Sequence, residues 1–370
     1  MDLVTILAFF LILSLIVLIH ELGHFLTAKK FGIKVEEFGF GFPPRMFGIK
    51  KGETVYSVNW LPVGGFVKLY GEDDAGGGSV KRNTKHEITK GNLKRAFFVR
   101  PAWQRAIIVV AGVVMNFLLA VVLISFLFAA QGVAIPGNTI RVVDTLKNSP
   151  SFVAGIKKDD VIVAIGDKKI SKTEDFIAET KKHLGEALTL TIKRGDSTFT
   201  VTLIPRTNYP KGEGPMGIGI TNIEIKKYAW YEAPFFGTIE AFKFSYMIAS
   251  GIGMMIFDLV LHGTKPAGVA GPVGVAQLTG QAVSGGLYVT LWFISLLSLN
   301  LAVLNILPIP ALDGGRLFFI LIELVTRKKI NPKYETYAHA AGLVALLALI
   351  VLITFFDVAR LIAGKSILQP

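Results

Sequence analysis

The strongest constraint on this chain is a set of apolar runs long enough to cross a lipid bilayer. Crossing the hydrocarbon core takes about 20 mostly apolar residues. Four stretches reach that length: 3–28, 106–130, 287–307, and 340–356 with its apolar flank. Backbone polar groups cannot stay unpaired in lipid, so such segments fold as helices. The sequence therefore predicts a polytopic α-helical membrane protein with about four transmembrane helices.

The composition supports a membrane partner over a nucleic-acid partner. Hydrophobic residues make up 52% of the chain and charged residues 18%, and the net charge is +12. The basic residues lie between the apolar runs, which favours an anionic membrane face, and no nucleic-acid-reading motif is present. We therefore expect the lipid bilayer as a partner and no nucleic acid. The absence of cysteine excludes disulfides, thiolate ligands and a cysteine nucleophile.

The loop charges predict an orientation. The loop 29–105 and the short loop 327–333 are rich in Lys and Arg, which favours the cytoplasmic side of a cell inner (plasma) membrane. Both termini and the segment 131–285 would then be extracytoplasmic. The chain begins Met1-Asp2 without a basic region, and no small-residue cleavage site follows the first run. We therefore expect a retained span rather than a signal peptide.

A fifth apolar stretch, 242–261, is ambiguous. It contains Lys243, Asp258 and several glycines, so it fits either an amphipathic helix at the membrane interface or another span. We favour the interfacial helix.

The segment 138–206 has the pattern of a small mixed α/β domain. Two strand-like stretches precede an amphipathic helix over 172–185, and a Gly195-Asp196 turn separates two alternating strands. The stretch SPSFVAGIKKDDVIVAIGDKKI resembles a PDZ domain, although Asp159 replaces a usual glycine. We expect an N-terminal membrane core over 1–130, an extracytoplasmic PDZ domain over 131–222, a linker with an interface helix over 223–285, and a C-terminal membrane core over 286–370.

The sequence HELGH lies at the end of the first apolar run. His20 and His24 are four residues apart, so a helix presents both on one face, where they can bind one metal ion. Glu21 can take a proton from a metal-bound water, and zinc is the usual metal for this spacing. Chance could produce the motif on a soluble helix, but beside a membrane span unpaired polar groups cost about 3 kcal/mol each.

A third ligand would have to come from a distant part of the chain. Asp313 follows an apolar run that Pro308 and Pro310 interrupt, and broken backbone at this depth requires a cavity or buried surroundings. The carboxylate could serve as a metal ligand. It could also cap the helix that begins near Gly314, and the two interpretations are compatible.

These motifs together resemble the site-2 protease family of intramembrane zinc metalloproteases, and its bacterial RseP-like type in particular. The resemblance rests on HELGH and on N-x-x-P-x-P-x-L-D-G from Asn305 to Gly314. AGVVMN (111–116), LPVGGFVKLYGE (61–72) and GVAGPVGVAQ (268–277) resemble further segments of the family in the same order. The best-known members carry two tandem PDZ domains, whereas this chain has room for one.

The resemblance implies roles for individual residues. His20, His24 and Asp313 would bind Zn²⁺, and Glu21 would act as general base and then as proton donor. The enzyme would cut single-pass membrane proteins in regulated intramembrane proteolysis, with anti-sigma factors or remnant signal peptides as substrates. Asn305 could bind the substrate backbone or bridge helices. We expect Asn116 to be structural and the histidines at 86, 183, 262 and 339 to be incidental.

The stretch VYSVNWLPVGGFVKLYGE (55–72) predicts strand pieces interrupted at 62–65. An edge strand over 66–69, including Phe66 and Val67, could hold an unwound substrate by strand addition, and Gly64 and Gly65 would allow close approach of the two backbones. The PDZ domain could bind an exposed C-terminus, reject bulky ectodomains, or act as a spacer.

Three rival functions are weaker. A catalytically silent membrane PDZ receptor would be expected to lack a ligand or Glu21, and none is missing. A metal transporter would need polar groups along several helices, and here they cluster at one depth. A prenyl-protein-processing protease would lack the Asp313 motif and the PDZ insertion.

Overall fold

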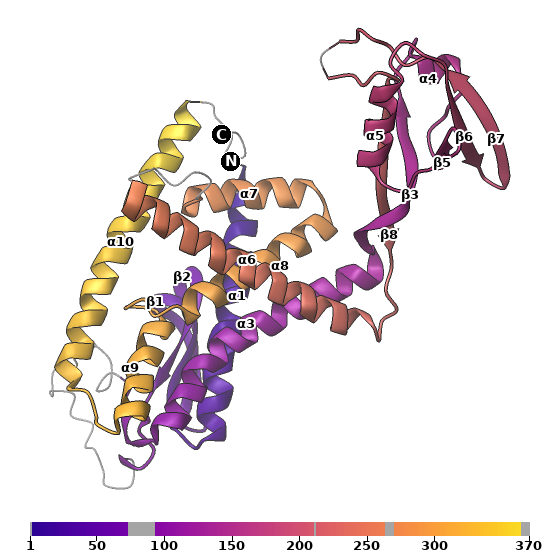
Figure 1. Ribbon diagram of the computed structural model, residues 1–370. Helices are drawn as coiled ribbons and strands as arrows, with labels where there is room; N and C mark the ends of the chain where they lie inside the picture. Colours follow the sequence, from indigo (N-terminus) through magenta and orange to yellow (C-terminus); the bar gives the residue numbers. More distant parts are fainter. Residues whose placement is uncertain (1, 73–92, 211, 263–269, 364–370) are drawn as a thin grey trace. The chain divides into compact units, whose positions relative to one another are not determined.

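The computed structural model describes residues 2–72, 93–210, 212–262 and 270–363. The chain forms two compact units, one made of Met1–Leu127 and Ala229–Pro370 and the other of Phe128–Tyr228. We call the first the helical unit and the second the sheet unit, and describe each by itself (Figure 1).

The helical unit contains the long apolar helices. They are α1 (Leu3–Lys30), α3 (Ala102–Ala130), α6 (Ala233–His262), α8 (Leu287–Ile306) and α10 (Pro332–Ile362). These five helices in the described part are long and apolar enough to span a membrane. Four of them contain the predicted spans. The fifth, α6, qualifies with the lowest mean hydropathy, 1.2, so the interfacial interpretation of this helix stays a prediction.

Two shorter helices of the described residues also belong to this unit. The helix α7 (Pro272–Ser284) precedes α8, and α9 (Asp313–Thr326) follows the proline-containing break. In α10, the buried Asp357 accepts a hydrogen bond from the Gly274 N–H in the first turn of α7 at 2.8 Å. This carboxylate therefore supplies the acceptor that the apolar start of α7 lacks.

Close helix contacts depend on small residues. A Cβ on Gly23 of α1 would overlap the Ala111 carbonyl of α3, and one on Gly280 of α7 would come 2.7 Å from the Thr5 Oγ1 of α1. Glycine at such positions lets helix backbones approach closely, which is how helices associate in lipid.

The strands β1 (Val35–Lys51) and β2 (Thr54–Leu69) lie beside α1 (Figure 1). The hairpin itself turns at Gly52. The predicted interruption at 62–65 is confirmed in the pairing, because residues 54–61 and 65–69 pair with β1 as two separate pieces and residues 62–64 have no partner there, although all lie within the bounds of β2. This part of β2 is held by α1: the Ser14 hydroxyl donates to the Pro62 carbonyl at 2.9 Å and accepts from the Gly64 N–H at 3.3 Å. Ser14 of α1 thus stabilises the part of β2 that has no partner in β1.

The pairing register makes residues 65–69 an edge of this sheet. The first half of β1 has partners on both sides, since Phe38 pairs with Tyr56 and also with Val67. Residues 65–69 have β1 on one side only, and α1 lies near the other. An apolar cluster fixes the base of the hairpin against the helices; it comprises Ala28, Ile33, Val35, Leu69, Phe97, Ile108, Val109 and Ile320.

A charged cluster ties the hairpin turn to the end of α1. The Glu53 carboxylate accepts two hydrogen bonds from Arg95, at 2.6 and 2.8 Å, and one from Lys29 at 2.9 Å. The bonds from Arg95 lower the pKa of Glu53 to about 2, since together with the bond from Lys29 they outweigh the opposing effect of partial burial.

The sheet unit contains one antiparallel sheet of order β7-β6-β4-β3-β8, with β5 paired to β4. Its strands are β3 (Val133–Thr145), β4 (Val161–Ile165), β5 (Lys168–Lys169), β6 (Leu188–Arg194), β7 (Ser197–Leu203) and β8 (Ile218–Lys226). The helices α4 (Pro150–Val153) and α5 (Thr173–Lys182) accompany them. The helix over 172–185 and the turn at Gly195 agree with the pattern, and β8 runs to Lys226, four residues past the predicted boundary at 222.

Alternating apolar residues of these strands build one core, together with Phe176 of α5 and Met216. Asp160 closes the adjoining loop: it accepts the Lys157 N–H at 2.8 Å and two bonds from Arg194 at 2.6 and 2.8 Å. The chain is therefore a polytopic helical membrane protein with an inserted mixed α/β PDZ domain.

Candidate metal centre

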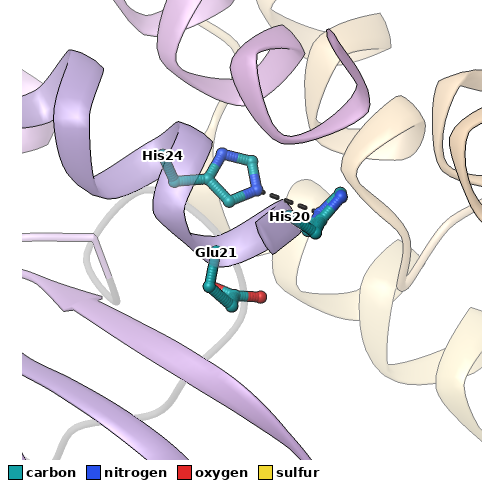
Figure 2. Close-up of side chains that lie close together, drawn as sticks. All are labelled: His20, Glu21 and His24. Atoms are coloured by element: carbon teal, nitrogen blue, oxygen red, sulfur yellow. Dashed lines mark hydrogen bonds between the residues drawn. The ribbon is translucent and has the colours of Figure 1, made fainter. Parts of the chain in front are cut away.

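His20 and His24 lie one turn apart on α1, and both side chains are buried (Figure 2). Their Nε2 atoms are 3.1 Å apart. The helix places the two rings on the face that packs against α3, as the spacing of four residues predicts. Two imidazoles thus point toward one spot.

Asp313 joins this pair from the distant helix α9. Its Oδ2 lies 2.8 Å from His20 Nε2 and 3.3 Å from His24 Nε2. Asp313 is the first residue of α9, and Leu312 is the N-cap without a side-chain bond. Of the two interpretations that the sequence allowed for Asp313, the helix cap is therefore wrong, because the carboxylate turns to the histidines instead.

The other ring nitrogens have partners that orient the imidazoles. His24 Nδ1 lies 2.8 Å from the Ile108 carbonyl, so Nδ1–H donates and Nε2 keeps its lone pair for a ligand bond. His20 Nδ1 lies 3.4 Å from the Asn116 amide nitrogen, while the buried Asn116 Oδ1 has no hydrogen-bond partner. Turning this amide by 180° would bring Oδ1 to an Nδ1–H of His20.

Gly112 of α3 leaves space beside the two imidazoles. A Cβ at this position would come 2.5 Å from His24 Nε2 and 2.7 Å from His20 Nε2. The ligand atoms, their oriented rings and this space fit Zn²⁺, which takes three N or O ligands and keeps a fourth position open in catalytic sites. The residues present therefore suit the metal.

Glu21 points from α1 toward the hairpin, away from the ring pair (Figure 2). Its Oε2 accepts a hydrogen bond from the Val67 N–H of β2 at 3.0 Å. Ligand atoms of Glu21 and the two histidines all lie within 4.8 Å of one another. The carboxylate therefore lies between the ring pair and the edge of the sheet.

A cavity of about 700 Å³ opens onto this centre. Among its lining residues are Glu21, His24, Gly65, Phe66, Val67, Leu69, Glu72, Asp313, Arg316 and His339. Two predicted substrate-binding residues lie elsewhere. Gly64 faces Val17 of α1, and Asn305 is buried on α8 outside the lining residues.

Some site residues escaped prediction. Gly112 and Asn116 are four residues apart on the second span, so they share one helix face. That spacing could have predicted that both lie beside the histidines. His339, expected to be incidental, lines the cavity and accepts the Ala311 N–H at 3.0 Å. His183 contacts Glu179 in the sheet unit and His262 pairs with Asp258, while residue 86 lies outside the described residues.

Comparisons with known proteins agree with this centre. Residues 8–349 match peptidase family M50. A relative from Clostridium perfringens is 36% identical over 93% of this chain and 96% of its own length. The zinc metalloprotease RasP of Oceanobacillus iheyensis is 30% identical, over 96% of this chain and 99% of its own. The regulator of sigma-W protease RasP of Bacillus subtilis is 28% identical, with the same coverage.

A solved PDZ domain of an SdrC-like protein from Listeria monocytogenes covers 24% of this chain and 95% of its own, at 19% identity and a TM-score of 0.21. The PDZ assignment rests on the sheet and the residue pattern described above. The match over nearly the whole length places the chain in peptidase family M50, the site-2 proteases, and makes it an intramembrane zinc metalloprotease.

Proposed function

We propose that this enzyme hydrolyses peptide bonds in or beside the transmembrane segment of single-pass membrane proteins. His20, His24 and Asp313 hold the zinc ion, and Glu21 is the general base. The observation that carries the proposal is the convergence of three ligand atoms within 3.3 Å at the wall of a cavity that Glu21 also lines. Two neutral imidazoles and one carboxylate form a donor set typical of catalytic zinc.

When bound, the zinc ion supplies a polarised water and a Lewis acid for the scissile carbonyl. Glu21 takes the water's proton and gives it to the leaving amine. Ile108 and Asn116 keep the imidazoles oriented through their Nδ1 atoms, and both rings are buried. Asn305, buried away from the cavity, acts in helix packing.

The substrate binds as an added strand on the edge formed by residues 65–69. A substrate helix hides its peptide bonds in its own hydrogen bonds, so cleavage requires an extended segment. Val67 presents its N–H to the cavity side, and that N–H now bonds to Glu21. A substrate carbonyl on the Val67 N–H would free Glu21 for proton transfer.

The PDZ domain lies outside the cytoplasm and limits access by bulky ectodomains, while loop 29–105 is cytoplasmic. Anti-sigma factors or remnant signal peptides are substrates of the right form: one apolar span with little folded mass outside the membrane. The loop charges support this orientation.

The test is co-expression with tagged single-span proteins that lack large ectodomains, followed by mass spectrometry of the fragments. Wild type, Glu21→Gln and Asp313→Ala are compared, with Asp167→Ala in the sheet unit as a matched control. Cuts inside the span that disappear in Glu21→Gln and Asp313→Ala but persist in Asp167→Ala support the proposal. Cuts that persist in all variants would assign the cleavage to another protease.

A further inference from the structure

At the Val67–Leu69 end of the cavity-facing edge, two N–H groups of β2 point outward, and a carboxylate accepts a hydrogen bond from each. The Tyr70 N–H donates to the Lys34 carbonyl on the β1 side, so by alternation the N–H groups of Val67 and Leu69 point the other way. The Val67 N–H bonds to Glu21 at 3.0 Å, and the Leu69 N–H bonds to Glu72 Oε2 at 3.3 Å. Both positions where substrate carbonyls would bind are therefore taken.

Glu72 is held in place by another residue that lines the cavity. Its other oxygen, Oε1, accepts a hydrogen bond from Arg316 of α9, and both side chains are only partly exposed, 20% for Glu72 and 29% for Arg316. Arg316 follows Asp313 by three residues, so the two share one face of α9. The pair thus joins the end of the substrate edge to the helix that carries a proposed zinc ligand.

Capping the end of the strand would explain one of the two hydrogen bonds between Glu72 and Leu69, but not the other. Glu72 already closes the turn through its own N–H, which donates to the Leu69 carbonyl at 3.2 Å. The added carboxylate bond satisfies an N–H that faces the cavity, and the Arg316 contact fixes the carboxylate there. A carboxylate oxygen on a strand N–H occupies the place of a peptide carbonyl.

We propose that Glu72, anchored by Arg316, is a positioning residue that competes with the substrate for the Leu69 N–H. This inference rests on the proposed strand addition at residues 65–69. A substrate carbonyl must displace Glu72 before pairing extends from Val67 to Leu69. Only a segment unwound over both positions gains the second backbone bond, so the pair favours extended substrates over helical ones.

The experiment measures cross-linking at the edge strand. The chain has no cysteine, so Lys68→Cys provides a single thiol beside Val67 and Leu69. The probes are single-span proteins with one cysteine at successive positions of the span, reconstituted with the full-length enzyme in phosphatidylethanolamine–phosphatidylglycerol vesicles. A bismaleimide joins the two thiols, and Glu21→Gln in every sample prevents cleavage of the bound probe.

The test variant is Glu72→Ala with Arg316→Met, which frees the Leu69 N–H and leaves no unpaired guanidinium. The matched control is Glu37→Ala with Arg45→Met, an ion pair of 2.7 Å between residues of β1. Glu72→Gln keeps an oxygen near the N–H, and Arg316→Gln removes only the anchor. Zinc content, measured in each variant, reports the metal centre independently.

We expect the test variant to cross-link roughly three to ten times faster than the parent, which corresponds to one displaced hydrogen bond. Glu72→Gln should cross-link at a rate near that of the parent. Arg316→Gln should raise the rate about twofold, because it weakens the bond between Glu72 and the Leu69 N–H without removing it. The control pair should not change the rate. Equal rates in the parent and the test variant would overturn the role of Glu72 while leaving docking at the edge intact.

Absence of cross-links in every variant would overturn docking at this edge, and the role of Glu72 with it. If the enzyme with Glu21 restored still cut the same probes, the peptidase function itself would stand. The two failures are therefore distinguishable.

Discussion

The sheet unit and the helical unit both bury apolar side chains, but the helical unit also places large apolar side chains on its outer surface along helices long enough to span a membrane. The core of the sheet unit is apolar throughout, with Leu190 and Ile192 fully buried. The helical unit exposes large apolar residues such as Leu11, 72% exposed, and buries Asn116 and Ser298 completely. In water, burial of apolar area drives folding, whereas helices in lipid gain mainly from close packing and hydrogen bonds. The same chain thus combines a unit stabilised mainly by apolar burial with a unit that also depends on close helix packing and buried polar contacts.

The largest expected effect is removal of a partly buried charge from the helical unit. Asp313→Ala deletes the carboxylate that lies against both histidines, so we expect zinc content and peptidase activity to fall to background. Atomic absorption and fragment analysis measure the two effects. Asp167→Ala, an exposed carboxylate of the sheet unit, should change neither. Full zinc content in Asp313→Ala would remove this residue from the ligand set.

The second test makes the same substitution, leucine to alanine, once in each unit. Leu190→Ala in the sheet core should destabilise that unit by about 2–5 kcal/mol, through lost burial and the cavity left behind. Leu11→Ala, on the exposed face of α1, should stay within about 0.5 kcal/mol in detergent or vesicles. Hydrogen exchange of each unit in the full-length protein reports both values. A large effect at Leu11 would mean that this face contacts protein rather than lipid.

The third test compares two glycines. Gly112→Ala brings a Cβ to 2.5 Å from His24 Nε2, so the rings must shift, and we expect zinc affinity to fall roughly 10- to 100-fold, as for loss of an orienting partner. In Gly219→Ala the new Cβ would have ordinary contacts of 3.6 Å or more in β8. Competition with a chelator gives the affinities. Unchanged affinity in Gly112→Ala would show that the centre adapts without loss.

The smallest expected effect concerns a polar group buried in the sheet unit. Burial alone would raise the pKa of Asp160, but the hydrogen bonds from Arg194 and the Lys157 N–H hold this pKa below its ordinary value. The carboxylate's contribution is therefore present above about pH 4 and is lost as the pH falls through the lowered pKa. Asp160→Asn should cost about 1.5 kcal/mol at pH 7 and less at pH 3. Hydrogen exchange at the two pH values checks this, and a pH-independent cost would assign the effect to packing.

Local patterns carried much of the fold and part of the site. The HELGH spacing predicted that His20 and His24 share a face, because a helix repeats every 3.6 residues. The prolines before Asp313 indicated broken backbone at membrane depth. In the sheet unit, alternation and the Gly195 turn predicted the hairpin of β6 and β7.

Those local patterns could not predict contacts between residues that are far apart in the sequence. The bond from Val67 to Glu21 spans 46 residues and that from Arg316 to Glu72 spans 244, so no local period encodes either. The turn at Gly52 was not predicted, because the Pro62–Gly65 segment carries stronger turn signals than Gly52. The conformation of the Pro62–Gly65 segment within β2 depends on hydrogen bonds to Ser14, which lies on α1.

The fit of Gly23 against Ala111 has a mechanical consequence. Since even one methyl group on Gly23 would overlap the Ala111 carbonyl, α1 cannot slide freely along α3, and the two helices behave as one part. In contrast, α6 and α10 have only 6% of their apolar windows buried, against 39% for α3. Stress from heat or harsh detergent should therefore detach the two outer helices first, and the histidines should keep their mutual distance until the last stage of disassembly.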